Sequence, residues 1–186
     1  QRFMKIAKSL ESELRKRERL INIHLGSEVF YHDNLLELID EPIATLGKGK
    51  YMLIEFSPHH IPSSQRKVLF DLKMKGVTPI IAHPERYKLV QNNINVVYDW
   101  INAGCIIQID AGSLIGLLGK MAKEASISIL REGCCHILAS DAHNDSNRNF
   151  CIKEAYVYAK KMIGKDADLL VYDHPSMVIK GDDLYF

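Results

Sequence analysis

The sequence has little of several features that would assign a protein to a class at once. It carries no apolar run long enough to span a membrane, and we find no secretory signal in it. Neither charge sign is in excess, because 24 Lys and Arg residues stand against 23 Asp and Glu residues, with a formal net charge of +1. Bulk charge therefore favours neither a nucleic-acid partner nor an anionic membrane. We expect no membrane insertion and no nucleic acid among the partners.

Cysteine is also scarce, with four residues and no CxxC pair. Cys134 and Cys135 are adjacent, which suits a disulfide poorly, and Cys105 and Cys134 lie in apolar surroundings. We therefore expect reduced, mostly buried thiols and a cytoplasmic protein. No arginine follows Cys134 or Cys135 at the spacing of a Cys-x5-Arg loop, which excludes phosphatases with a cysteine nucleophile. A GxSxG elbow and a P-loop are absent as well.

What the sequence does contain is a regular alternation of strand and helix patterns from Ile21 to Ile163. The 186 residues suit a single domain, residues 1–186. The alternation predicts the α/β class, with a parallel sheet or barrel. The expected strands cover residues 21–31, 51–56, 79–82, 105–109 and 136–139. The expected helices cover residues 2–20, 34–39, 64–76, 95–102, 114–131 and 148–163.

The segment after Asp166 is ambiguous. Residues 169–172 are apolar enough for a strand, but the spacing of Ala167, Leu170 and Val171 favours a helix. We expect that helix to end before Pro175.

Polar side chains gather where the expected strands end. In α/β folds, ligands bind beyond the carboxyl ends of the parallel strands. Five strand ends carry carboxylate, imidazole, guanidinium or amide groups, namely Glu28, His59, His83, Arg86, Gln108, Asp110, Asp141 and His143. No single residue is strong evidence, but their repetition at equivalent positions predicts a polar site at this edge of the sheet.

Asp141 and His143 are two residues apart, so an extended chain would point both side chains to one face. Together with Glu28 and His83, they offer two carboxylates and two imidazoles, which suit a divalent metal such as Mn, Fe or Zn. Glu28 or Asp141 could bridge two metals. The nearby arginines, Arg86 and Arg148, would bind the oxygens of a phosphate through their planar forks.

Two simpler interpretations remain open at this point. Asp141 could cap a helix that begins near His143, which would then be merely exposed. His59 and His60 are adjacent in a loop, so at most one could reach a common site, and we favour loop surface for both.

Four segments carry a resemblance to a known family. The segment Ile80–Tyr87, Ile-Ile-Ala-His-Pro-Glu-Arg-Tyr, resembles a signature of the bacterial protein-tyrosine phosphatases of the PHP (polymerase and histidinol phosphatase) superfamily, which are encoded with capsule and exopolysaccharide genes. Residues 108–113 with Gly116 and Gly119 are similar to the family's next motif, and residues 140–144 with Arg148 are similar to its last. Residues 26–29 resemble its glutamate motif. The resemblance extends from about Gly26 to Gly181.

The resemblance implies a (β/α)7 barrel and a trinuclear centre of the Mn type. It implies metal binding by Glu28, His83, Asp141 and His143. Phosphate binding would fall to Arg86 and Arg148, with Ser113 as a further substrate contact. The implied substrate is phosphotyrosine in the tail of a bacterial tyrosine kinase that regulates polysaccharide export.

One part of the family pattern is missing. The family begins with a strand that carries His-x-His and a nearby Asp, and no such pattern precedes Glu28. His59 and His60 do not replace it, because they are adjacent rather than alternating. We expect a barrel incomplete at its N-terminal side, with an open edge, depleted metal and reduced activity.

Two other functions compete with this one. A small-molecule phosphomonoesterase of the same superfamily, similar to histidinol phosphatase, would use the same metal chemistry. A catalytically inactive binding module would hold a partner at the remaining site without turnover. Kinetics on phosphopeptides and small substrates would distinguish a small-molecule phosphomonoesterase from a protein phosphatase. Metal content would distinguish an inactive binding module from an enzyme.

Overall fold

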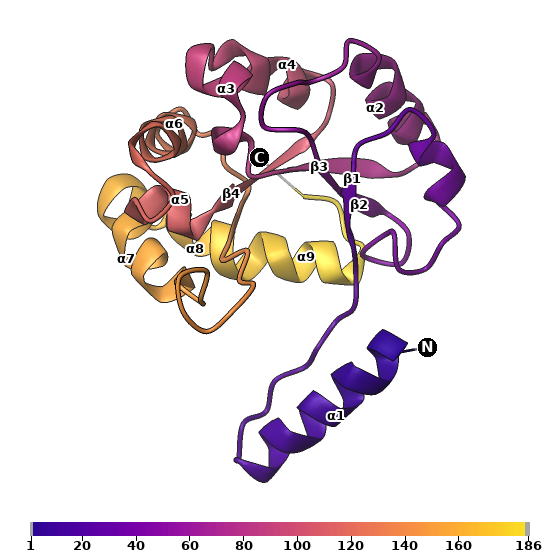
Figure 1. Ribbon diagram of the computed structural model, residues 1–186, viewed down its shortest axis with the longest axis vertical. Coiled ribbons are helices and arrows are strands. Elements are labelled where there is room, and N and C mark those ends of the chain that lie inside the picture. Colours follow the sequence, from indigo (N-terminus) through magenta and orange to yellow (C-terminus); the bar gives the residue numbers. More distant parts are fainter. Residues whose placement is uncertain (1, 185–186) are drawn as a thin grey trace.

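The computed structural model describes residues 2–184 and shows an α/β protein built on one parallel sheet (Figure 1). Its strands follow one another across the sheet in chain order, and every neighbouring pair is parallel. The predicted α/β class and parallel sheet are confirmed. Within residues 2–184 the two outer strands do not pair with each other, so the sheet is open and no closed barrel is seen. The strands are β1 (Glu28–Phe30), β2 (Tyr51–Glu55), β3 (Thr78–Ala82), β4 (Ile106–Asp110) and β5 (Ile137–Ala139).

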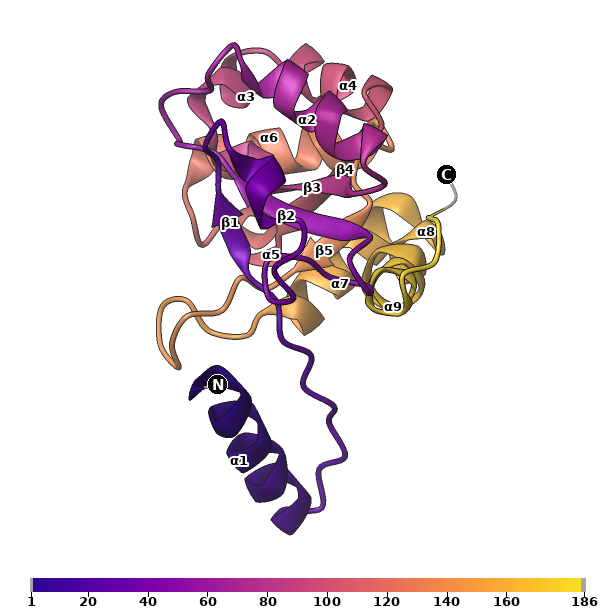
Figure 2. The same ribbon diagram turned by 90° about the vertical axis from the view of Figure 1, so that its right-hand side faces the viewer.

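Helices connect the strands and cover both faces of the sheet. Figure 2 shows α2 and α4 on one side of the sheet and α9 on the other. The α-helices are α1 (Arg2–Lys16), α2 (Gln65–Met74), α3 (Lys88–Asn92), α4 (Asn95–Asn102), α5 (Ala111–Ile115), α6 (Lys120–Arg131), α7 (Ile152–Ile163), α8 (Asp166–Asp168) and α9 (His174–Lys180). Shorter turns are η1 (Leu35–Leu38), η2 (Pro84–Arg86) and the π-helical η3 (Leu169–Asp173).

The two faces of the sheet bury different sets of side chains, because successive residues of a strand point to opposite faces. The larger core includes Met52, Ile54 and Ile107 together with Leu69 of α2 and Trp100 of α4. The smaller core, on the other face, joins strand residues to Val178 of α9: they are Tyr51, Ile80, Ile106 and Ile137. Burial on both faces explains why these strands are nearly continuous apolar runs.

Helix α1 stands apart from the sheet (Figures 1 and 2). None of residues 2–16 is buried, and Phe3, Ile6 and Leu10 are each at least half exposed. A hydrogen bond from the backbone N–H of Ile23 to Glu11 Oε1, 2.8 Å long, ties the following segment to the helix. Among residues 2–184, no helix is both long enough and apolar enough to cross a bilayer.

Several predicted boundaries are wrong. The expected helix over residues 2–20 ends at Lys16, and the expected strand over residues 21–31 is reduced to residues 28–30. Residues 21–27 alternate in polarity, but alternation produces a strand only where a neighbouring strand supplies hydrogen bonds. Such a neighbour for residues 21–27 is missing from the part of the chain that the structure describes.

The expected helix over residues 114–131 is also wrong, because two helices occupy this region. Helix α5 already begins within the expected loop 110–113, and α6 begins at Lys120. Gly116 and Gly119, with φ angles of 94° and 97°, separate them in a conformation that other residues rarely adopt. The expected helix over 148–163 begins only at Ile152, and α3 was not predicted.

Helical structure after Asp166 is confirmed, but the expected end before Pro175 is wrong. The chain continues from α8 through the π-helical turn η3 into α9, which includes Pro175 in its first turn. A proline is tolerated there because its missing N–H is not needed by the first turn of a helix.

His136, just before β5, is a buried histidine that the fold keeps neutral. It is 4% exposed, and its Nδ1 accepts a 3.0 Å hydrogen bond from the backbone N–H of Ile107. Burial lowers the pKa of His136 to about 4. Protonation would both charge a buried ring and remove the acceptor of this hydrogen bond.

We expect His136 to make the fold less stable in mild acid. Between the ordinary histidine pKa and about 4, the unfolded chain binds a proton that the folded chain does not, so stability falls as the pH drops through this range. The loss should approach on the order of 3 kcal/mol. His136→Asn keeps an acceptor for Ile107 but cannot titrate. Urea unfolding of both proteins at pH 7 and pH 4.5 measures the effect, and an equal pH dependence in the two proteins would contradict it.

Candidate metal centre

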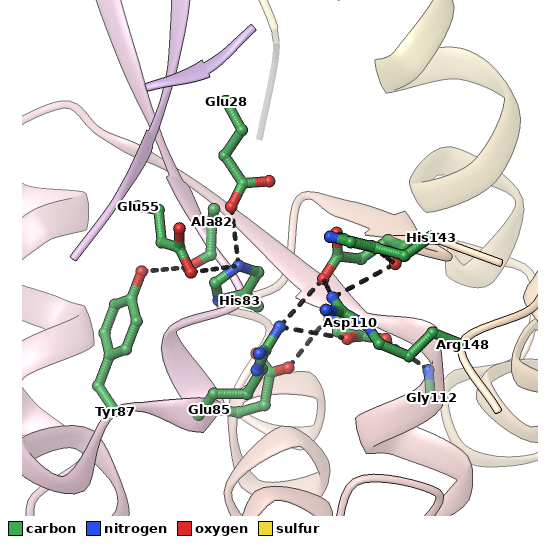
Figure 3. A network of polar contacts seen from close by, with 12 residues as sticks. Glu28, Glu55, Ala82, His83, Glu85, Tyr87, Asp110, Gly112, His143 and Arg148 are labelled. Carbon is green, nitrogen blue, oxygen red and sulfur yellow. Dashed lines mark hydrogen bonds and ion pairs between the residues drawn. The ribbon is translucent and has the colours of Figure 1, made fainter. Parts of the chain in front are cut away.

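Six of the predicted polar residues line one cleft, and Figure 3 shows the polar contacts there. Most of them follow the carboxyl ends of strands, but Glu28 is the first residue of β1. The cleft has a volume of about 320 Å³. The structure therefore brings together the four predicted metal ligands and the two predicted phosphate-binding arginines. The lining residues are Glu28, Glu55, His83, Arg86, Asp141, His143 and Arg148.

Glu28, Glu55 and His83 form the tightest group of candidate ligands. His83 Nε2 lies 3.0 Å from Glu28 Oε1 and 3.5 Å from Glu55 Oε1. One ligand atom from each residue lies within 4.8 Å of the others, the only such group of three acidic, histidine or cysteine side chains within residues 2–184. Two carboxylates and one imidazole are suitable donors for a divalent cation, so this group fits a metal.

The pKa values of Glu28 and His83 agree with the hydrogen bond between these two side chains. The hydrogen bond from His83 lowers the pKa of Glu28. Partial burial raises it by less, so the pKa of Glu28 lies below its usual value. Burial acts to lower the pKa of His83, but the hydrogen bond and charge of Glu28 outweigh it, and the pKa of His83 is raised. The Glu28 carboxylate thus favours a positive charge at this point of the cleft.

Glu55 was not among the predicted site residues. It is the last residue of β2 and stands in register with Phe30 of β1. Its side chain is 30% exposed on the cleft. The signal that could have revealed it is an acidic residue at the end of an otherwise apolar strand, ahead of the loop that carries His59 and His60. Both of these histidines are exposed, and neither lines the cleft.

His83 is placed by the turn that follows β3. Its φ of 32° lies in the left-handed region, which is uncommon for a residue with a side chain. Tyr87, at the other end of the turn, is fully buried, donates to the carbonyl of Ala82 at 2.6 Å and accepts from the N–H of Phe56 at 2.9 Å. Two hydrogen bonds from one hydroxyl therefore fix this turn against β2 and β3.

Asp141 joins the two arginines. Its Oδ2 accepts a 3.0 Å hydrogen bond from Arg86 Nη1 and a second, shorter one from Arg148 Nη2. Arg148 also belongs to a loop that is closed on itself, because its carbonyl accepts from the N–H groups of His143 and Asn144. Both guanidinium groups thus converge on one carboxylate at the side of the cleft formed by the β5 exit.

The local arrangement of Asp141 and His143 differs from both sequence interpretations. The chain is not extended there, because Asp141 has a φ of 43°. A helix capped by Asp141 is also wrong, since the next helix begins at Ile152. His143 is half exposed, with Nδ1 2.8 Å from the Asp141 carbonyl and 3.6 Å from Asp141 Oδ1. Metal binding by these two residues stays a prediction.

Three other residues singled out from the sequence lie outside the cleft. Ser113 is fully buried in α5, so the structure does not place it where it could touch a substrate. Gln108 lies within β4 and does not line the cleft. Asp110, at the end of β4, is buried and caps α5 by accepting a 2.7 Å hydrogen bond from Gly112.

The fold and the cleft define an α/β protein with a candidate metal centre and paired arginines at the carboxyl ends of parallel strands. A family described as "Capsular polysaccharide synthesis, CpsB/CapC" matches residues 1–180. The match covers nearly the whole chain, and the chain belongs to this family.

Similar proteins carry the names of phosphatases. Tyrosine-protein phosphatase YwqE of Bacillus subtilis is 31% identical over 180 residues, which are 96% of this chain and 71% of YwqE. Tyrosine-protein phosphatase CpsB of Streptococcus pneumoniae is 35% identical, over 84% of this chain and 68% of CpsB. A crystal structure from work on YwqE and CpsB, described as unique metal-dependent tyrosine phosphatases, superposes with a TM-score of 0.89. It shares 30% identity over 97% of this chain and 74% of that chain.

We expect Glu55→Gln to weaken metal binding. The change keeps the size of the side chain but removes one of the two carboxylate charges beside His83. Loss of a ligand or its support typically costs roughly tenfold to a hundredfold in metal affinity. The measurement is elemental analysis of the protein after equilibration with Mn²⁺ and dialysis. Exposed Glu41→Gln is the matched control, and a metal content equal to that of the unaltered protein would remove Glu55 from the centre.

Proposed function

We propose that this chain is a metal-dependent hydrolase of protein phosphotyrosine. The observation that carries the proposal is the cleft itself, in which a group of candidate metal ligands faces two arginines held by one carboxylate. The printed names of YwqE and CpsB, together with the capsule synthesis family, support tyrosine phosphate as the substrate.

Glu28, Glu55 and His83 would hold a divalent metal, with Asp141 and His143 as the further predicted ligands. A metal held there supplies charge stabilisation and lowers the pKa of bound water. Mn²⁺ is the proposed ion, with Fe or Zn as alternatives, because the donors are oxygen and nitrogen and no thiol lines the cleft. The solved relative described as metal-dependent supports a metal but not its identity.

Arg86 and Arg148 would bind the phosphoryl group. A guanidinium presents two parallel N–H donors that match two phosphate oxygens, and it keeps its charge at every physiological pH. Phosphoryl transfer depends chiefly on positioning and on stabilising charge at these oxygens, which is a task for fixed cations. Asp141 already holds both groups toward one point, so they need little rearrangement to act together.

The proposed partner is the phosphotyrosine tail of a bacterial tyrosine kinase that regulates polysaccharide export. A flexible tail is a suitable substrate because the lining of the cleft is charged and its side chains are partly exposed. We place the reaction in the cytoplasm, and the four free cysteines, all buried, support this location.

We further propose that residues 1–186 form one domain of the PHP type. In such a domain, the open sheet β1–β5 would be part of a (β/α)7 barrel. The parallel order of the strands and the position of the cleft at their carboxyl ends support this assignment.

A comparison of substrates tests the function. With Mn²⁺ supplied, hydrolysis of a phosphotyrosine peptide should exceed hydrolysis of histidinol phosphate in kcat/KM by at least about tenfold, because the open cleft can accept a protein segment. A chelator should abolish the activity. A preference for the small phosphomonoester would favour the second enzyme class, and metal binding without any turnover would favour a binding module.

The arginines and the metal ligands should separate in mutants. Arg86→Ala and Arg148→Ala should lower phosphotyrosine hydrolysis by on the order of 10²–10³ while leaving metal content unchanged, because a guanidinium does not ligate a cation. His143→Ala should lower metal content and activity together. Arg86→Lys should recover little, since an ammonium lacks the planar fork. Hydrolysis rates beside elemental analysis decide the matter, and metal loss in the arginine variants would reassign both arginines to support of the centre.

A further inference from the structure

Arg86 lies near two carboxylates that come from different strand ends, those of Asp110 and Asp141. Its Nη1 is 3.0 Å from Asp141 Oδ2 and 3.8 Å from Asp110 Oδ2. Asp110 is 4% exposed and does not line the cleft, whereas Asp141 lines the cleft and is a proposed metal ligand. The two carboxylates therefore stand in different positions relative to any ligand of the cleft.

Glu85, the residue before Arg86, connects back to Asp110. It is fully buried, and its Oε1 accepts a 3.2 Å hydrogen bond from the backbone N–H of Asp110. Its own carbonyl accepts from Gln91 Nε2 at 2.9 Å, which ties the turn to α3. The side chain of Glu85 thus holds the backbone of Asp110, while the side chain of Asp110 faces Arg86.

Three polar atoms of Asp110, the backbone N and the two carboxylate oxygens, have separate partners. The N–H donates to Glu85, Oδ1 accepts from the N–H of Gly112, and Oδ2 is the atom nearest Arg86. The hydrogen bond to Gly112 fixes the side-chain torsion, so Oδ2 cannot turn away from the guanidinium without breaking the cap of α5. This arrangement joins the turn after β3 to the end of β4 twice, and we refer to these two connections as the Glu85–Asp110 clasp.

We propose that the Glu85–Asp110 clasp positions Arg86 for phosphate, with Asp110 as a positioning residue rather than a catalytic one. This inference rests on the proposed phosphate-binding role of Arg86. Asp141 contacts both arginines and is also a proposed metal ligand. Its hold on Arg86 would weaken when it binds the metal. Asp110 is outside the candidate metal group and stays behind the guanidinium, so it can hold Arg86 while Asp141 turns to the metal.

The clasp has a distinctive expected effect on catalysis. A negative charge near the phosphate site does not help phosphate to bind, so removing it should not weaken ground-state affinity. Loss of orientation should instead lower kcat, because the transition state depends on accurate placement of the guanidinium. A general structural defect would weaken binding, metal content and turnover together.

Asp110→Asn tests the charge while keeping the fold. The amide oxygen can still accept from Gly112, so the cap of α5 is retained, but the charge facing Arg86 is gone. Asp99→Asn is the matched control, because Asp99 pairs with Arg66 on the exposed surface, with 2.9 Å between Arg66 Nη2 and Asp99 Oδ2. Glu85→Ala, which removes the acceptor for the N–H of Asp110, tests the second connection, and Glu85→Gln should largely restore it.

Three measurements on the full chain test the proposal, with diamagnetic Zn²⁺ supplied for NMR and Mn²⁺ supplied for the kinetics and the calorimetry. The ¹⁵N order parameter of Arg86 Nε should fall in Asp110→Asn. The order parameter of Arg148 Nε should stay unchanged, because the carboxylate that Arg148 contacts is that of Asp141. In phosphotyrosine-peptide hydrolysis, kcat should fall by roughly tenfold to a hundredfold. Calorimetric affinity for inorganic phosphate should stay within about threefold of the unaltered protein or become tighter, with metal content unchanged.

The failures are distinguishable. An unchanged order parameter of Arg86 in both Asp110→Asn and Glu85→Ala overturns the clasp, whatever the kinetics. Equal loss of kcat, phosphate affinity and metal content would make Asp110 a structural residue and would also overturn it. If Arg86→Ala retains full phosphatase activity, the proposed function of Arg86 fails, and the positioning role for phosphate fails with it even where the order parameter changes.

Discussion

Hydrogen bonds of two buried side chains, Glu85 and Tyr87, hold the turn over residues 83–87 in place. Tyr87 satisfies its hydroxyl with the backbone of β2 and β3, and Glu85 receives the N–H of Asp110. With these two side chains fixed inside the protein, His83 and Arg86 are left to face the cleft. Losing one of these hydrogen bonds would leave a buried group without its partner and cost about 1–3 kcal/mol, which disfavours other conformations of the turn. The direction of both functional side chains follows from the burial of their neighbours.

The cleft divides into two halves that match the order of the strands. Glu28, Glu55 and His83 come from β1, β2 and the end of β3, and together they favour a cation. Asp141 and Arg148 follow β5, where guanidinium groups favour an anion. Arg86 belongs by sequence to the first half and by contact to the second. A phosphate ester is negatively charged and can bridge a metal and arginines, so a cleft polarised in this way suits its hydrolysis.

The parallel sheet and most of the cleft could be predicted from the sequence, because apolar strands followed by polar residues recur along the chain. Glu55 was missed since it lies inside an apolar run, and only the pairing of β2 with β3, in which Ile54 stands beside Ile81, brings it near His83. The pairing of Asp141 with two arginines depends on a left-handed residue, which no periodicity reveals. Residues 21–27 alternate correctly for a strand and still form none, because strand formation needs a neighbour as well as a pattern.

The coincidence of strand order with chain order also has a consequence for how the molecule is assembled. Each new strand adds beside the one made just before it, so most pairings join segments that are close in sequence. Each connection is shorter than one that crossed the sheet would be, so its closure costs less entropy and the growing sheet can form stepwise as the chain lengthens. The cation-favouring half of the cleft is complete once β3 and its exit turn exist, whereas the anion-favouring half waits for Arg148. A chain interrupted between these points would carry Glu28, Glu55, His83 and Arg86, but neither Arg148 nor Asp141, the carboxylate that joins the two arginines.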